Sequence, residues 1–294
     1  MVMLNELKSK TASGWINGCL GVLIFSGSLP ATKIAVMDFD PIFLTVARAS
    51  IAGLFALIVL FIFKEKHPIY SQIVPLIIVA LGVVVGFPLL TALALQHITS
   101  AHSIVFLGLL PLSTAIFGVW RGGEHPHPAF WIFSIVGSLL VMGFAFIQGV
   151  SASLAGDTLM LAAVLVCGLG YAEGAKLSRV LGGWQVICWA LIISLPAMLI
   201  MTFMFMPNSF ANVSTPVWIS LVYVSLFSML IGFIFWYRGL AQGGIAAVGQ
   251  LQLLQPFFGL ALSATVLGEP VNLLMIAVTI GVILCVVGSR LFAK

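Results

Sequence analysis

Three glutamines and a proline stand close together in an apolar segment near the end of the chain: Gln250, Gln252, Gln255 and Pro256. Gln252 and Gln255 are three residues apart and share one face of a helix. Pro256 removes a backbone hydrogen bond and frees a carbonyl one turn earlier. Such groups can hold the ammonium and carboxylate of an amino acid without a fixed charge. The alternative, which we favour for Gln250, is that the amides join neighbouring helices.

A second set of residues could form an apolar wall at a similar depth. Phe87 and Thr91 are four residues apart, so they share a helix face. Gly108 lies close to Pro111 and leaves room for a bulky side chain, and we expect Pro111 and Pro256 to act as hinges. Aromatic walls suit apolar or aromatic solutes. The alternative is that most of the 22 phenylalanines contact lipid or neighbouring helices.

Two cations, Lys33 and Arg48, lie inside apolar segments. Arg48 is roughly 10 Å from the end of its segment by helix rise, a depth at which a charge is expensive. Lys33 is near an end, on the same face as Ser26. Either cation could pair with Asp38 or Asp40 and fix the hairpin between the first two helices. The alternative is a mouth that attracts the carboxylate of a solute.

Glu173 is a carboxylate well inside an apolar segment, three residues before Lys176. A local ion pair with Lys176 is the favoured interpretation, and a proton-coupling site is the alternative. Since no titratable acid lies at mid-depth, the sequence favours facilitated movement over obligatory proton exchange.

Histidines and cysteines do not form a metal site. The pairs His97/His102 and His125/His127 have no third ligand nearby, and the four cysteines have no ligand spacing. We therefore expect neither a metal nor another cofactor.

The composition of the chain predicts that these residues lie in a membrane. Apolar residues make up 62% of the 294 residues and charged residues 7%, against roughly a quarter charged in soluble domains. This excludes a soluble enzyme, a disordered chain and, because no basic run exists, a nucleic-acid binder. The chain is expected to be an integral membrane protein in contact with lipid.

The apolar segments are long and continuous, which predicts membrane-spanning helices and not the strands of a β-barrel. A spanning helix needs about 20 apolar residues. Ten segments meet this requirement, and short loops join them: Gly14–Val36, Pro41–Phe63, Ile73–Leu95, Ser103–Trp120, Pro128–Gln148, Gly156–Leu177, Trp184–Met206, Pro216–Tyr237, Ala246–Leu267 and Val271–Ser289.

The loops differ strongly in charge from one side of the predicted membrane to the other. Ten of the twelve Lys and Arg residues fall on the side of the N-terminus, and the opposite loops contain none. Basic loops stay in the cytoplasm. We therefore expect both termini in the cytoplasm of a bacterium and the spans in its inner, or plasma, membrane.

The two halves of the chain resemble each other. An offset of 145 residues places Pro111 on Pro256 and Gly123-Glu124 on Gly268-Glu269. Each half then has five spans, residues 1–150 and 151–294, and an odd number of spans inverts the second half. Inverted repeats around a site at mid-depth are a common plan of secondary transporters. The predicted fold class is all-α, with ten helices in two inverted repeats around a central cavity.

Two stretches carry a resemblance to a known family. They are Ala94 to Glu124, ALQHITSAHSIVFLGLLPLSTAIFGVWRGGE, and Gly239 to Pro270, GLAQGGIAAVGQLQLLQPFFGLALSATVLGEP. With the ten spans and the repeat, they resemble the drug/metabolite transporter superfamily, EamA type. The family's usual Trp-Gly in the first span reads Phe25-Ser26-Gly27 here. Within the superfamily, the chain is most similar to exporters of aromatic and neutral amino acids of the YddG type.

The resemblance implies which helices line the transport pathway: the first, third, fourth, sixth, eighth and ninth. The residues that would face the pathway or bind the solute are Phe25, Ser26, Phe87, Thr91, Gly108, Gly168, Tyr171, Gln252 and Gln255, with Lys33, Arg48 and Glu173 as gating or charge residues.

Other functions lack their motifs in this sequence. It has no HExxH, GxSxG, Walker A loop or paired intramembrane aspartates, so an intramembrane enzyme is disfavoured. Ten unlike helices in one chain fit a channel poorly.

The charges inside the spans limit the cargo. A cationic drug would need a buried acid, and a nucleotide sugar would need several cations, which favours a neutral amino acid. The alternative is an exporter of another small metabolite or drug, possibly coupled to protons. We expect a monomer, with a dimer as the alternative.

Overall fold

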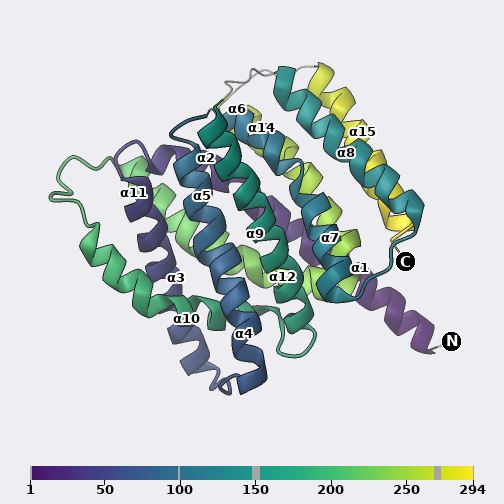
Figure 1. The fold of residues 1–294 in the computed structure, drawn as a ribbon, viewed down its shortest axis with the longest axis horizontal. Helices are drawn as coiled ribbons and strands as arrows, with labels where there is room; N and C mark the ends of the chain where they lie inside the picture. The colour runs from purple at the N-terminus through teal and green to yellow at the C-terminus, as the bar shows by residue number, and fades with distance from the viewer. Residues whose placement is uncertain (1, 99, 148–152, 268–272, 294) are drawn as a thin grey trace.

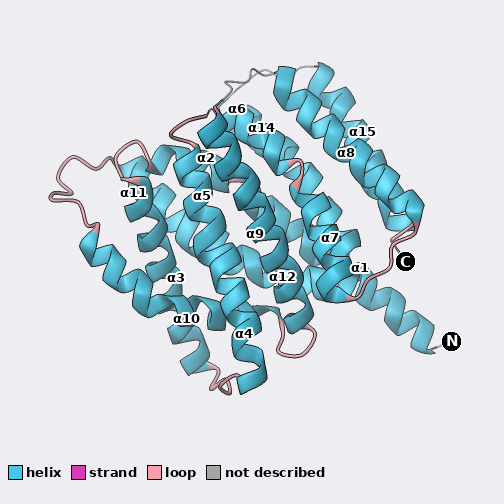
Figure 2. Cartoon of the chain, viewed as in Figure 1, coloured by secondary structure: helices cyan, strands magenta, loops and turns pink. Residues whose placement is uncertain are grey.

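The computed structural model describes residues 2–98, 100–147, 153–267 and 273–293, and all its regular elements in these ranges are helical (Figure 2). The predicted all-α fold class is thereby confirmed. In the first half the elements are α1 (Val2–Ser26), α2 (Ser28–Ala35), α3 (Pro41–Ile62), α4 (Tyr70–Val79), the π-helix η1 (Ala80–Gly86), α5 (Phe87–Ala94), α6 (Ser100–Leu107), α7 (Leu110–Gly122) and α8 (Pro128–Ile147).

The described part of the second half is also helical. Its elements are α9 (Leu154–Ser178), α10 (Gly183–Met204), α11 (Thr215–Val222), the π-helix η2 (Tyr223–Ile231), α12 (Gly232–Gly243), α13 (Ile245–Gly249), the 3-10 helix η3 (Gln250–Leu254), α14 (Gln255–Leu267) and α15 (Leu273–Leu291) (Figure 1).

Nine helical stretches of the described residues are long and apolar enough to cross a membrane. They correspond to nine of the ten predicted spans. The remaining prediction, Ala246–Leu267, is not one continuous helix but the three pieces α13, η3 and α14. The change to 3-10 geometry lies directly before Pro256, which cannot donate the hydrogen bond that a continuous α-helix needs there. Gly268 and Glu269, which the predicted repeat pairs with Gly123 and Glu124, lie outside the described residues.

The irregularities of the helices recur at matching places in the two halves. The third span of each half contains a π-helix, η1 in the first and η2 in the second. The fourth span of each half is interrupted before its proline: a turn at residues 108–109 precedes Pro111, and η3 precedes Pro256. π-Bulges and proline breaks are common at functional sites, because they free backbone groups and redirect side chains.

The main packing contacts between spans have counterparts when every span is replaced by the equivalent span of the other half. The first span packs on the eighth through α1 and α12, and the equivalent sixth span packs on the third through α9 and α5. The second and seventh spans pack on each other, as do the fifth and tenth, α8 and α15, which lie side by side (Figure 1). Contacts that map onto themselves when the halves are exchanged are the mark of a two-fold arrangement.

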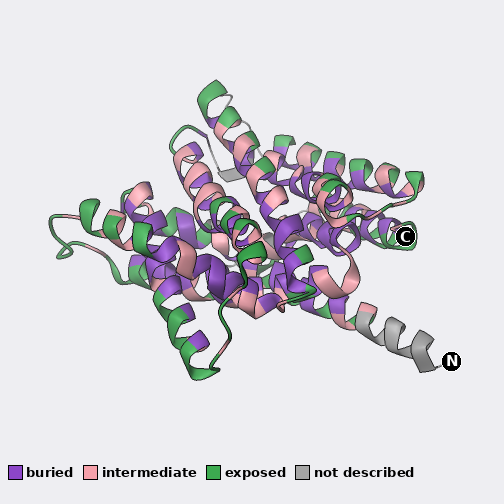
Figure 3. Cartoon of the chain, turned by 60° about the horizontal axis from the view of Figure 1, so that its bottom comes forward, coloured by how far each residue is buried: buried purple, intermediate pink, exposed green. Residues whose placement is uncertain are grey.

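The surface of the bundle is apolar where lipid would contact it. Exposed residues lie on the outer sides of the helices and buried residues between them (Figure 3). Large apolar side chains such as Ile132, Leu139, Ile280 and Leu284 are exposed on α8 and α15. In water this exposure would be costly, whereas the hydrocarbon core of a membrane accepts it.

Glycines set the distance between the two halves at their central crossings. A Cβ atom on Gly239 of α12 would lie 2.5 Å from the backbone nitrogen of Gly18 on α1, and one on Gly14 would lie 2.5 Å from that of Gly243. At the equivalent crossing, a Cβ atom on Gly82 would lie 3.0 Å from the Cα atom of Gly170. Small residues let membrane helices approach this closely.

Gly239→Ala is expected to destabilise the protein, because the added methyl group meets only backbone atoms, which cannot turn aside. We expect the free energy of unfolding to fall by about 1–3 kcal/mol, measured by thermal or denaturant unfolding in detergent micelles. The matched control is Gly143→Ala on α8, where a Cβ atom would meet nothing within 4 Å. Equal stability of the two variants would contradict the close crossing.

Candidate substrate cavity

A cavity lies between the two halves, at the level of the π-helices and the proline breaks. Its volume is about 60 Å³, room for a few water molecules. A larger solute therefore requires its walls to move apart. Seven of the ten spans contribute to the wall, which consists of Phe25, Ser28, Thr32, Arg48, Val83, Phe87, Pro88, Thr91, Leu107, Leu110, Tyr171, Ser228, Phe233 and Gln255.

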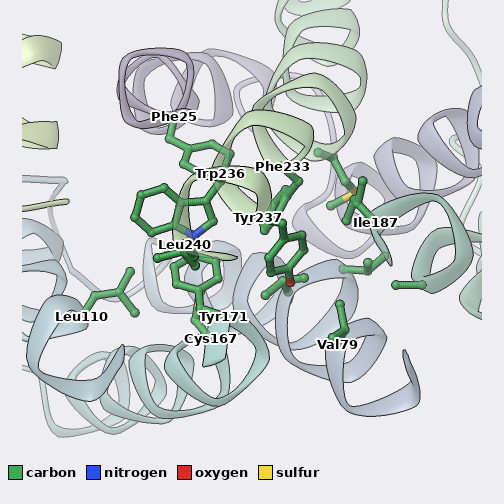
Figure 4. Packing of buried hydrophobic residues seen from close by; sticks show 14 of the residues in the cluster. Phe25, Val79, Leu110, Cys167, Tyr171, Ile187, Phe233, Trp236, Tyr237 and Leu240 are labelled. Atoms are coloured by element: carbon green, nitrogen blue, oxygen red, sulfur yellow. The ribbon is translucent and has the colours of Figure 1, made fainter. Parts of the chain in front are cut away.

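Aromatic rings form one side of the cavity. The ring of Phe25 lies 5.0 Å from that of Phe233, and the ring of Tyr171 lies 6.0 Å from Phe233. Trp236 stands behind them, 5.4 Å from Tyr171 and edge-on to it (Figure 4). These distances are typical of favourable ring pairs. The cluster makes this side of the cavity apolar.

Polar groups form another side of the cavity, around Arg48 of α3. Arg48 is only 8% exposed, and its Nη2 atom donates a hydrogen bond of 3.3 Å to the hydroxyl of Ser228 on η2. The hydroxyl of Ser28 on α2 also donates to Ser228, over 2.7 Å. The three side chains come from the first, second and eighth spans. They join both halves of the protein around one cation.

Of the three glutamines, only Gln255 lines the cavity. Its amide nitrogen donates a hydrogen bond of 3.3 Å to the carbonyl oxygen of Phe25. Gln252 is 3% exposed and lies near Tyr171, while Gln250 is completely buried. The amide atoms of Gln250 and Gln252 have no hydrogen-bond partner among the described residues. The structure therefore separates the two amides that the sequence places on one helix face.

The predicted wall residues divide into two groups. Phe25, Phe87, Thr91 and Tyr171 line the cavity together with Gln255 and Arg48. Thr91 is 5% exposed and its hydroxyl has no partner among the described residues. Phe87 and Thr91 lie about one turn apart on α5, which begins at Phe87 directly after the π-helix η1, and both line the cavity.

Besides Gln252, three predicted cavity residues lie elsewhere. The hydroxyl of Ser26 donates to the carbonyl of Val22 within its own helix. A Cβ atom on Gly108 would meet Met142 of α8, and one on Gly168 would meet Ser113 of α7. Both glycines therefore allow helices to pack closely and do not enlarge the cavity. A glycine's spacing does not tell these two roles apart.

The predicted ion pairs between the first two helices are wrong. Among the described residues, neither Asp38 nor Asp40 pairs with Lys33 or Arg48. Asp40 caps α3, since its carboxylate accepts from the backbone nitrogens of residues 42 and 43 over 2.8 and 3.2 Å. Asp38 accepts from the backbone and the hydroxyl of Ser214, over 3.0 and 3.1 Å. Lys33 is exposed and does not line the cavity. Both carboxylates are occupied elsewhere, so Arg48 faces the cavity without either of them.

Glu173 also has a different partner from the predicted Lys176. Its carboxylate, which is 3% exposed, lies 2.8 Å from the Nε atom of Arg121 on α7. Glu173 and Lys176 are near in sequence, but the short distance between α7 and α9 brings Arg121 closer. The ion pair joins the first half of the chain to the second.

Glu124 forms a second link between the halves at the same end of the bundle, where α7 and α9 finish (lower end in Figure 1). Its carboxylate oxygens accept from the backbone nitrogens of Ile245 and Ala246 over 2.7 and 2.8 Å. One of them also lies 2.9 Å from the Nη2 atom of Arg179. We call Arg121, Glu124, Glu173 and Arg179 the ionic latch.

Packed side chains fill the space between the cavity and the ionic latch. Trp236 and Tyr237 are completely buried there, and the hydroxyl of Tyr237 donates to the carbonyl of Gly170 over 3.2 Å. Cys167 lies against Tyr171, one helical turn nearer the opposite end of α9, and is also completely buried (Figure 4). The cavity is therefore closed toward the lower end.

The sequence alone does not identify several of these residues. Ser228 and Phe233 lie in a segment with many apolar residues, and nothing in their spacing separates them from residues that face lipid. Glu124 could have been found, because the repeat places it beside a glycine at the end of a span. Its partners on α13 follow only from the packing of the two halves.

Comparison with known proteins gives a consistent family. A model of the EamA-like transporter family matches residues 12–148 and again residues 154–293. Uncharacterized transporter YdeK from Bacillus subtilis (strain 168) is 66% identical over 286 residues, which cover 97% of this chain and 100% of that protein. Uncharacterized transporter YyaM from the same organism is 24% identical and covers 92% of this chain and 90% of its own length.

A solved structure described as "Crystal structure of protein" has the same fold. Its TM-score is 0.77 at 18% identity, with 96% of this chain and 98% of that chain covered. The names of the relatives give no substrate. The similarity to amino-acid exporters of the YddG type therefore stays a prediction.

Glu124→Ala is expected to open the lower end more often. Hydrogen bonds to a charged group are each worth about 1.5–3 kcal/mol, so the population that exposes the inner layer should rise about tenfold or more. The reporter is Cys167, kept as the only thiol after Cys19, Cys188 and Cys285 are replaced by serine. The measurement is its rate of reaction with a water-soluble maleimide.

Glu65→Ala is the matched control for this experiment. Glu65 is a carboxylate at the same end, but its contact is a hydrogen bond of 3.4 Å from Gln185. Its loss should leave the labelling of Cys167 unchanged. If Glu124→Ala labels no faster than Glu65→Ala, the ionic latch does not hold the lower end closed.

Proposed function

The chain belongs to the EamA-like transporter family and is a multi-pass membrane transporter, and on this basis we propose that it exports neutral amino acids, aromatic ones among them, by alternating access. The observation that carries the proposal is the central cavity, which lies between the two inverted halves and is closed at one end. Each half contributes to its wall. A small relative rotation of the halves would open it to one side and close it to the other.

The chemistry of the cavity supports a small solute with an apolar body. Phe25, Tyr171 and Phe233 offer ring faces and edges to such a body. Gln255 and Thr91 add neutral polar groups. No carboxylate lines the cavity in the described part of the chain, which argues against a cationic drug. One arginine is too little charge for a nucleotide sugar.

Alternating access requires that one end be held closed while the other is open. The ionic latch and the aromatic layer supply that closure at the lower end. Basic residues gather at this end, among them Arg121, Arg179 and Arg238, which supports a cytoplasmic position. In this arrangement both termini lie in the cytoplasm and the solute leaves from the opposite end.

Facilitated movement fits the cavity better than proton exchange. The described wall residues include no Asp, Glu or His. Glu173 lies outside the cavity and is held by Arg121. A proton-coupled transporter needs a titratable group whose protonation depends on the bound solute. Seven spans of a single chain surround the cavity, and we propose the monomer as the transporting unit.

Gln255→Ala is expected to reduce amino-acid transport at least several-fold while the protein still folds, because the amide both faces the cavity and holds the carbonyl of Phe25. The measurement is export of radiolabelled aromatic, branched and small amino acids from proteoliposomes. The matched control is Gln250→Leu, which removes a buried amide of the same segment outside the cavity. Transport of none of these amino acids by the wild-type protein would refute the proposed cargo.

Counterflow of a transported amino acid is expected to continue at equal pH on both sides of the membrane. The reason is that no described wall residue changes its charge near neutral pH. The measurement is uptake of labelled solute into proteoliposomes loaded with the unlabelled solute, with and without a protonophore. A strict requirement for a pH gradient would show that proton coupling drives transport.

A further inference from the structure

Arg48 is a buried cation without a counter-ion. The ion pairs of the described residues involve Arg121, Arg179 and His102, not Arg48. Among the described residues, no carboxylate forms an ion pair with its guanidinium. Arginine stays charged in proteins, and burying an unpaired charge is unfavourable. The structure therefore maintains an unfavourable charge beside the cavity.

Most of the hydrogen-bonding capacity of Arg48 is unused. A guanidinium has five N–H donors. The hydrogen bond to Ser228, at 3.3 Å, is longer than the usual range, and Nε has no partner among the described residues. A planar fork of free donors matches a carboxylate, which can accept two parallel hydrogen bonds from it.

The neighbouring polar groups also favour an anion. Ser228 accepts hydrogen bonds from both Arg48 and Ser28, so its own hydroxyl proton is left to donate. The hydroxyl of Thr91 also has no partner among the described residues. This side of the cavity therefore presents donors around a positive charge. An ammonium group would meet the same charge as a repulsion, with only neutral acceptors such as Gln255 to compensate.

We propose that the cavity selects monocarboxylates with an apolar or aromatic body, that Arg48 binds the carboxylate, and that an α-ammonium group is dispensable. This inference rests on the proposed function in one respect, that the cavity is the transport site. It goes further because it predicts that deaminated analogues of the amino acids are also substrates. The carboxylate lies at Arg48, and the body lies on the rings of Phe25, Tyr171 and Phe233.

Three probes with the same aromatic body separate the charged groups: 3-phenylpropanoate carries only the carboxylate, L-phenylalanine carries both groups, and 2-phenylethylamine carries only the ammonium. Binding to the purified full-length protein is measured by isothermal titration calorimetry in detergent. We expect phenylpropanoate to bind at least as tightly as phenylalanine, and phenylethylamine to bind at least tenfold more weakly. Equal or tighter binding of the amine, or no binding of phenylpropanoate, would overturn the inference.

Arg48→Gln is expected to weaken binding of phenylpropanoate at least tenfold and to remove the preference over phenylethylamine. The matched control is Lys33→Gln, which removes the other cation of the first two spans; Lys33 is exposed and outside the cavity. This control should keep the order of the three probes. If Arg48→Gln also keeps that order, another group selects the carboxylate.

Arg48→Met distinguishes a binding role from a structural one. Replacing an unpaired buried charge with an apolar side chain of similar length should leave the melting temperature of the solute-free protein unchanged or raised. It should also abolish the stabilisation that phenylpropanoate gives to the wild-type protein. A marked loss of stability without solute would show that Arg48 serves the fold.

The proposed cargo and the carboxylate site fail in different experiments. If amino acids are not transported but phenylpropanoate binds in a way that requires Arg48, the cargo is wrong and the inference stands. If amino acids are transported and Arg48→Gln leaves the order of the probes intact, the cargo stands and the inference is wrong.

Discussion

Close backbone contact between the two halves is the constraint on which the cavity depends. Gly14 and Gly18 meet α12, and Gly82 meets Gly170, at two crossings that the exchange of halves relates. Because these helices touch at their backbones, the side chains on either side of each crossing must point into the centre or out to lipid. The cavity is the space left in the centre, where the π-helices and proline breaks turn residues away from their expected faces.

The protein treats its buried charges in two different ways. Glu173 and Glu124 are held by arginines and backbone nitrogens, so their burial is compensated inside the protein. Arg48 is 8% exposed, yet its hydrogen bonding among the described residues is limited to the 3.3 Å contact with Ser228. The cavity beside Arg48 has room for only a few water molecules, which compensate such a charge less fully than bulk water does. The paired charges therefore lie at the contacts that close the lower end. The unpaired charge lies where, in our proposal, the carboxylate of a solute binds.

The sequence was sufficient for the fold and for part of the site. Apolar length depends on composition, so it predicts the helical spans well, and the repeated proline and Gly-Glu predict two related halves. Contacts between distant helices depend on packing, which spacing does not encode. The closeness of Lys176 in the chain predicts that it pairs with Glu173, but α7 brings Arg121 nearer. Gln252 and Gln255 separate because η3 replaces the regular helix that the spacing assumes. Gly108 and Gly168 could equally widen a cavity or let helices pack closely. The side chains beside them, Met142 and Ser113, show that they do the second.

The cavity and the ionic latch are carried by the same helices, which connects binding to gating. On α9, Tyr171 lines the cavity and Glu173, two residues later, holds Arg121. On α7, Leu110 lines the cavity and Arg121 stands three turns below it. A shift of α7 against α9 that breaks the latch must therefore also move two walls of the cavity. A solute changes the equilibrium between two conformations only if it contacts them differently. A bound solute that pushes Tyr171 and Leu110 apart meets this condition, because the cavity in its closed-end form has room for only a few water molecules.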